Sequence, residues 1–240
     1  MLPELSRRLA LSGIAHIGFV SRARFDTDAP SGFRLGELAP GAESVVVAAS
    51  AGRDFWESFA RYAKEHPGWL ARENPLDDFT RIAVDEATRE MTDVVRAFFP
   101  FFSFEPRLPF QKLGVLAGLG QPSPLGLLVH PAHGPWFALR AAIAIATPAP
   151  DVPPLARVCD TCIEKPCITA CPGHAVTVQG WDATRCVAEC QKGEPCASGC
   201  DARRACPIGR DSAYSPAAVH HHHTRGFLSH FRIIEDGARN

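Results

Sequence analysis

Nine cysteines constrain this chain more than any other feature, because all of them lie between residues 159 and 206. They form two groups, and each group ends in a Cys-Pro pair. The groups are Cys159, Cys162, Cys167 and Cys171, followed by Pro172, and Cys186, Cys190, Cys196, Cys200 and Cys206, followed by Pro207. An odd number of cysteines packed into one short region argues against a disulfide framework and predicts metal ligands.

The spacing of the first group resembles that of bacterial ferredoxins. In their C-x2-C-x2-C-x3-C-P run, three thiolates bind one cubane cluster and the fourth binds the other. The chain differs by two additional residues between Cys162 and Cys167. Crossing the ligands in the ferredoxin manner predicts two [4Fe-4S] clusters. Cluster one takes Cys159, Cys162, Cys167 and Cys206, and cluster two takes Cys171 with three of Cys186, Cys190, Cys196 and Cys200. A structural zinc site is the alternative, since C-x2-C pairs also bind zinc.

Composition places few further limits on the function. With 240 residues and 46% hydrophobic content, the chain can bury one sizeable core, or one core and a small satellite. Its 25 Lys and Arg nearly balance its 26 Asp and Glu, which favours neither nucleic acid nor a membrane surface as a partner. The N-terminus lacks a signal-peptide pattern, and no apolar run reaches the roughly 18 residues of a spanning helix. These features predict a cytoplasmic protein.

The hydrophobic patterns before the cysteines predict an α+β fold. Strands and helices mix without the regular alternation of a doubly wound sheet. The β-branched run in 43–49 predicts a sheet covered on both faces. The expected strands are 14–20, 43–49, 125–130 and 137–146, the last two adjacent as in a hairpin, and the expected helices are 2–11, 55–66 and 77–99.

Four prolines in 147–155 interrupt these patterns and predict a domain boundary. We expect a cofactor-binding domain over 1–150 and a cysteine-rich domain over 151–212 that folds around its metal. The remaining residues, 213–240, are expected to form a helical tail that packs back on the first domain. The run His220 to His223 is interpreted as part of a native helix.

Two family resemblances extend this interpretation. The run HPAHGPWFALR, residues 130–140, resembles the HP-x-x-G-x-W-F-x-x-R run of the cytosolic cobalamin-processing proteins of type C, and 74–86 resembles their upstream helix. LAPGAESVVVAA at 38–49, AGLG at 117–120 and the two Cys-Pro groups resemble epoxyqueuosine reductases. Those enzymes join a cobalamin-binding, nitroreductase-like domain to a ferredoxin-like module with two [4Fe-4S] clusters.

The resemblance implies a nitroreductase-like mixed sheet with flanking helices, followed by a small ferredoxin-like iron-sulfur module. It implies a cobalamin-dependent or cobalamin-processing reductase whose clusters pass electrons to a cofactor on the N-terminal domain, with flavin as the alternative to cobalamin. The expected partners are an electron donor protein or small reductant, and cobalamin or another small-molecule substrate. The alternative function is a ferredoxin-like electron carrier or a cobalamin chaperone without its own substrate.

The implied cofactor-binding residues are His130, Gly134, Trp136 and Arg140, with Arg140 suited to an anionic substituent or a thiol cosubstrate. The chain also departs from the reductase pattern. No aspartate stands where the family keeps its catalytic acid, Glu105 is the nearest carboxylate, and no catalytic residue is assigned. Where the family has GCD-x-C, this chain reads GCDARRAC, so Cys196 is taken as the replacing ligand and Cys190 as the spare cysteine. The chain also lacks the family's tRNA-binding extension, which disfavours tRNA as a substrate.

Overall fold

The computed structural model describes residues 2–101, 105–106, 108–193, 195–196 and 198–224. It is a mixed α+β structure, as predicted, and it divides into two compact units. The first, here called the sheet unit, comprises Met1–Gln121 and Phe137–Ala156. The second, the cysteine unit, comprises Pro122–Trp136 and Arg157–Asn240. The three-part division expected from the sequence remains a prediction.

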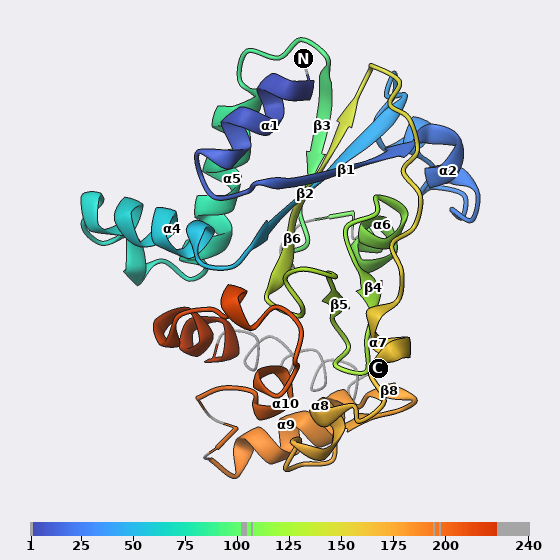
Figure 1. Cartoon of the computed structure of the whole chain (residues 1–240). Coiled ribbons are helices and arrows are strands. Elements are labelled where there is room, and N and C mark those ends of the chain that lie inside the picture. Colours follow the sequence, from blue (N-terminus) through green and yellow to red (C-terminus); the bar gives the residue numbers. More distant parts are fainter. Residues whose placement is uncertain (1, 102–104, 107, 194, 197, 225–240) are drawn as a thin grey trace. The chain divides into compact units, whose positions relative to one another are not determined.

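The sheet unit contains most of the regular structure (Figure 1). Its helices are α1 (Leu2–Ala10), α2 (Arg22–Asp26), α3 (Leu35–Leu38), α4 (Asp54–Glu65), the 3-10 turn η1 (Trp69–Ala71), α5 (Pro75–Thr88) and α6 (Phe110–Leu116). Its strands are β1 (His16–Ser21), β2 (Ser44–Ala51), β3 (Val94–Phe98) and β6 (Phe137–Ile145).

The cysteine unit consists of short elements. Strand β4 (Gln121–Pro122), at its start, pairs with β5 (Leu128–Val129). The later elements are α7 (Val158–Thr161), α8 (Pro166–Thr169), the hairpin β7 (Val176–Thr177) and β8 (Gly180–Trp181), α9 (Ala183–Gln191), α10 (Asp201–Arg204) and η2 (Arg210–Ser212). Residues 216–224 are helical and include the histidine run, as predicted. The rest of the expected tail, 225–240, lies outside the described residues.

The main sheet has the order β1-β2-β6-β3, and every neighbouring pair is antiparallel. The apolar composition of strand β2 follows from its packing on both faces. Val45 and Val47 point into a core shared with α2, α3 and α6. The alternate residues Val46 and Ala48 point into a second core shared with α1, α4 and α5. Helices thus cover both faces of the sheet (Figure 1). The prediction from the β-branched run is confirmed.

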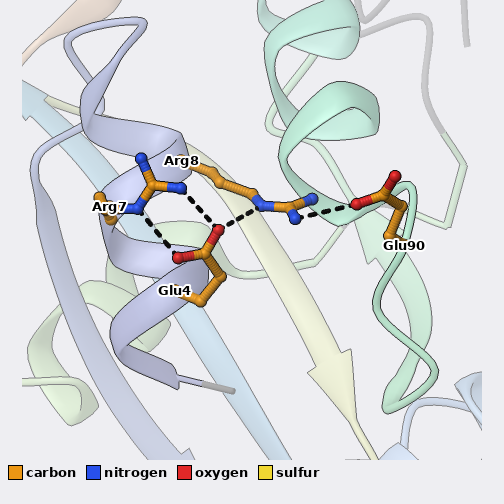
Figure 2. Close-up of polar contacts among 4 residues, drawn as sticks. All are labelled: Glu4, Arg7, Arg8 and Glu90. Atoms are coloured by element: carbon orange, nitrogen blue, oxygen red, sulfur yellow. Dashed lines mark hydrogen bonds and ion pairs between the residues drawn. The ribbon is translucent and has the colours of Figure 1, made fainter.

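Helix α1 packs on the core through its buried residues Leu5 and Leu9, and it carries a network of charged side chains on its outer side. Figure 2 shows Glu4 accepting hydrogen bonds from Arg7 and from Arg8, the latter at 2.7 Å from Nε to Oε1. Arg8 Nη2 also donates to Glu90, just beyond α5, at 3.0 Å. The two arginines hold the pKa of Glu4 at about 2. Since these groups are exposed to solvent, we expect the leucines to dominate the stability of this helix.

Two expectations about secondary structure were wrong. The predicted helix 77–99 ends at Thr88, and Val94–Phe98 forms the edge strand β3, paired with β6. The predicted hairpin between 125–130 and 137–146 does not form, because β6 pairs with β2 and β3 while β5 pairs with β4. In both cases pairing with residues distant in the sequence overrides the local pattern.

Within the described residues, no helix combines the length and the apolar character needed to cross a membrane.

Candidate functional site

Four cysteines of the cysteine unit line one small pocket: Cys159, Cys162, Cys167 and Cys206. They come from α7, from the residue after it, from α8 and from the turn after α10. The rest of the wall is largely apolar and includes Leu125, Val129, Pro166, Pro207 and Ile208. The structure therefore brings together the four thiols that the spacing predicts as ligands of cluster one.

Lys165 stabilises the conformation of the loop that carries three of these thiols. Its backbone has a φ of 42°, the left-handed region that non-glycine residues seldom adopt. Its Nζ donates hydrogen bonds to the carbonyl oxygens of Cys159, at 2.7 Å, and Cys162, at 3.0 Å. The ammonium group thus closes the loop and adds a positive charge beside the pocket.

Two opposing influences act on the pKa of these thiols. Burial raises the pKa of Cys159, Cys167 and Cys206, and the neighbouring thiols raise it further. In the opposite direction, the backbone N–H of Ile168 donates to Cys167, and that of Ile208 donates to Cys206. Coordination to a metal deprotonates a thiol outright, and N–H donors stabilise the resulting thiolate. The donor chemistry therefore suits an iron-sulfur cluster.

The five remaining cysteines also lie together. Burial and, to a lesser extent, the neighbouring thiols of Cys200, Cys186 and Cys171 raise the pKa of Cys196 to about 11. Backbone N–H donors occur here too, because Ala175 N–H donates to Cys171 Sγ at 3.3 Å and Arg203 N–H donates to Cys200. In the described part of the chain, no three His, Cys, Asp or Glu side chains converge closely enough to hold a single metal ion.

The run HPAHGPW forms a tight turn in the cysteine unit. His130 and Gly134 exchange backbone hydrogen bonds at 3.0 and 2.8 Å. The ring of His130 closes the turn from inside, since its Nδ1 accepts the N–H groups of Ala132 and His133 at 3.1 and 3.3 Å. Because Nδ1 is an acceptor, the ring proton of neutral His130 is on Nε2.

Gly134 meets the segment that follows Cys206. Its φ is 58°, and a Cβ atom at this position would lie 2.0 Å from the carbonyl oxygen of Ile208. Only glycine allows this approach of two backbones. The predicted cofactor residue Gly134 therefore has a structural role beside the first cysteine pocket.

Trp136 is 4% exposed and belongs to a stack of side chains within the cysteine unit. The guanidinium of Arg203 lies 4.6 Å from its ring and 4.7 Å from the ring of Tyr214, and donates to the carbonyl oxygen of Pro135 at 2.7 Å. The Tyr214 hydroxyl is buried without a hydrogen-bond partner among the described residues. This burial is typical of a core residue.

Arg140, the fourth predicted cofactor residue, is in the sheet unit and is 7% exposed. Its Nε donates to Ser50 Oγ at 2.8 Å, and its guanidinium lies 3.9 Å from the centre of the Phe55 ring. Asp77 lies close enough for the two charges to interact. Burial raises the pKa of Asp77 to about 6, although Arg140 opposes the shift. The sequence suggested only a helix-start aspartate here, and a perturbed carboxyl beside a buried arginine marks a candidate site.

Asp77→Asn is expected to stabilise the protein at neutral pH. The folded-state pKa of about 6 exceeds the ordinary 3.8, so ionised Asp77 opposes folding, and the penalty grows as pH rises from 3.8 to 6. We expect a gain in unfolding free energy of up to about 3 kcal/mol at pH 7.5 and about half of that at pH 5. Urea unfolding at both pH values measures it. Asp78→Asn, which removes an ion pair with Arg72, is the control, and an equal loss of stability in both variants would contradict the prediction.

Comparisons with known proteins establish the fold. No protein-family model matches the chain, and no curated protein matches it in sequence. Among solved structures it is similar to an epoxyqueuosine reductase, with 16% identity and a TM-score of 0.58 over 91% of this chain and 68% of that one. It is also similar to a catabolic reductive dehalogenase, with 12% identity and a TM-score of 0.51 over 96% of this chain and 35% of the other. The B12-trafficking protein CblC of C. elegans gives 14% identity and a TM-score of 0.48 over 94% and 96% of the two chains.

The similarities to the reductase and the dehalogenase show the fold of the chain. Its fold is that of the epoxyqueuosine reductases, as the sequence resemblance predicted. The reductive dehalogenase shares this fold over a part of its longer chain.

Proposed function

We propose that this protein is an iron-sulfur redox protein whose cysteine unit is a ferredoxin-like module with two [4Fe-4S] clusters. The convergence of Cys159, Cys162, Cys167 and Cys206 on one apolar pocket carries the proposal. These four would hold the first cluster, and Cys171, Cys186, Cys196 and Cys200 would hold the second. When bound, the clusters supply transfer of single electrons.

The residues around the thiols have separate tasks in this proposal. The apolar walls exclude water from the first pocket. The exclusion of water and the N–H donors to sulfur together set the reduction potential of the first cluster. Lys165 holds the loop of Cys159 and Cys162 and reduces the cost of concentrating negative charge there. These features suit electron transfer at a protected site.

We further propose that the protein is a cobalamin-dependent or cobalamin-processing reductase of the cytoplasm, with flavin as the alternative cofactor. Arg140 would bind an anionic group of the cofactor or a thiol cosubstrate, and His130 would contact a ligand through Nε2. Gly134 and Trp136 would support the loop that carries His130. Electrons would come from a donor protein or a small reductant. The fold shared with a reductase and a dehalogenase supports this proposal.

Metal analysis of anaerobically purified protein tests the first part. About eight irons with matching sulfide per chain are expected for two clusters, and zinc without sulfide would contradict the proposal. A spectral titration with cobalamin, and then with flavin, tests the second part. Turnover of an electrophilic substrate would separate a reductase from an electron carrier or a chaperone.

A further inference from the structure

The sheet unit contains a cavity of about 310 Å³ that is lined by residues of α6 and of the loop that follows α2. Its volume is at the lower end of the range for small-molecule sites. Its buried wall includes Phe25, Leu108 and Leu113, which also belong to the core on one face of the sheet. Its described lining contains no cysteine and none of the predicted cofactor residues. The cavity is therefore separate from the candidate redox site.

Hydrogen bonds hold the loop that forms one wall of the cavity. The N–H of Phe33 donates to the carbonyl oxygen of Pro30 at 3.0 Å and closes a turn in which Gly32 has a φ of 86°. The Oε2 atom of Glu37 accepts the N–H groups of Gly32 and Arg34, both at 3.0 Å. The turn places Phe33 in the cavity wall, where the residue is 40% exposed. An apolar ligand in the cavity would shield this ring from water.

Two charged residues line the same cavity, and they form an ion pair. The Nζ atom of Lys112, on α6, lies 3.1 Å from Oδ2 of Asp28. The side chain of Lys112 is 42% exposed and that of Asp28 is 72% exposed, so the ammonium is the more enclosed of the two charges. An exposed ion pair contributes little net free energy. Lys112 can therefore exchange Asp28 for another anion at small cost.

We propose that this cavity binds a small carboxylate with an apolar body. The apolar body would lie against Phe25, Phe33 and Leu113, and the carboxylate would take the place of Asp28 beside Lys112. An apolar cation suits the cavity less well, because it would have to pair with Asp28, whose charge is largely solvated. Binding requires neither the cysteine unit nor a cluster, so this site goes beyond the proposed redox function.

Calorimetric titration of the full-length protein with octanoate, octan-1-ol and octylamine provides the test. Octanoate is expected to bind most tightly, with a Kd in the millimolar range or below. Lys112→Gln should weaken octanoate about tenfold and leave the alcohol unchanged. Asp28→Asn removes the competing carboxylate and should strengthen octanoate by up to about fivefold. Lys64→Gln removes the same charge from an exposed position of α4 and should change neither ligand. Ala29→Phe, at a half-buried position of the lining, fills the cavity and should abolish the binding of both.

Several outcomes would overturn the inference. Absence of octanoate binding up to about 5 mM would leave no such site. Tighter binding of octylamine would make the cavity a cation site, and equal weakening by Lys112→Gln and Lys64→Gln would show that Lys112 does not contact the carboxylate. Octanoate binding by Ala29→Phe, with a circular dichroism spectrum like that of the parent, would place the ligand elsewhere. Iron and sulfide content should be the same in all variants. A parent protein without iron and sulfide would contradict the proposed function and leave this inference standing.

Discussion

Replacing Cys206 by alanine is expected to halve the iron and sulfide content, from about eight to about four of each per chain. Cys206 is the one member of the first pocket that comes from the second cysteine group. It is 9% exposed and receives the N–H of Ile208. Among the described residues, no fifth thiol lines this pocket. The second cluster should remain, because its candidate ligands are the other five cysteines.

Iron and sulfide analysis measures the loss, and EPR of the reduced protein identifies the cluster that remains. Cys190→Ala is the matched control, since it also removes a buried thiol but is expected to keep full iron content. The ligand assignment would be wrong if Cys206→Ala retained eight irons. Loss of all eight would show that the two clusters do not assemble independently.

The sequence predicted the two central strands of the sheet and missed one of its two edges, β3. Strands β2 and β6 are apolar runs that are buried on both faces, so composition alone identifies them. Edge strand β3 was missed because Val95 and Arg96 are exposed and the charged stretch before it continues the helical pattern. Among the described residues its strand partner is β6, which lies about 45 residues later, and a local pattern contains no information about such pairing.

The sequence likewise predicted only some of the residues of the candidate site. Cysteine spacing predicted which four thiols converge. Three of them are close together in the sequence, and the ferredoxin pattern of crossed ligands supplied Cys206. Lys165 and Asp77 could not be recognised as site residues, because each acquires its role through the fold. The pKa of Asp77, for example, is raised by burial and partly lowered again by Arg140, which belongs to a distant strand.

Gly134→Ala is expected to destabilise the cysteine unit and to weaken its first cluster. The added Cβ would overlap the carbonyl oxygen of Ile208, and alanine would have to adopt a φ of 58°. A clash with backbone cannot be relieved by a change of rotamer, so we expect a loss of about 3–5 kcal/mol. Ile208 is also the residue whose N–H donates to Cys206. Displacing it removes a hydrogen bond from a predicted cluster ligand and opens the pocket to water.

Gly193→Ala separates the clash from the backbone strain. Gly193 lies in the same unit with a φ of 106°, and a Cβ atom there would meet nothing within 4 Å. This control should lose about 1–2 kcal/mol from strain alone. Thermal unfolding followed by circular dichroism compares the stabilities, and the rate of iron release to a chelator under anaerobic conditions compares the clusters. If both variants released iron at the parent's rate, the contact of Gly134 with Ile208 would not support the cluster. Faster release from Gly134→Ala alone would make the HPAHGPW turn a structural part of the first metal centre, because the two backbones then have to meet for Cys206 to hold its position.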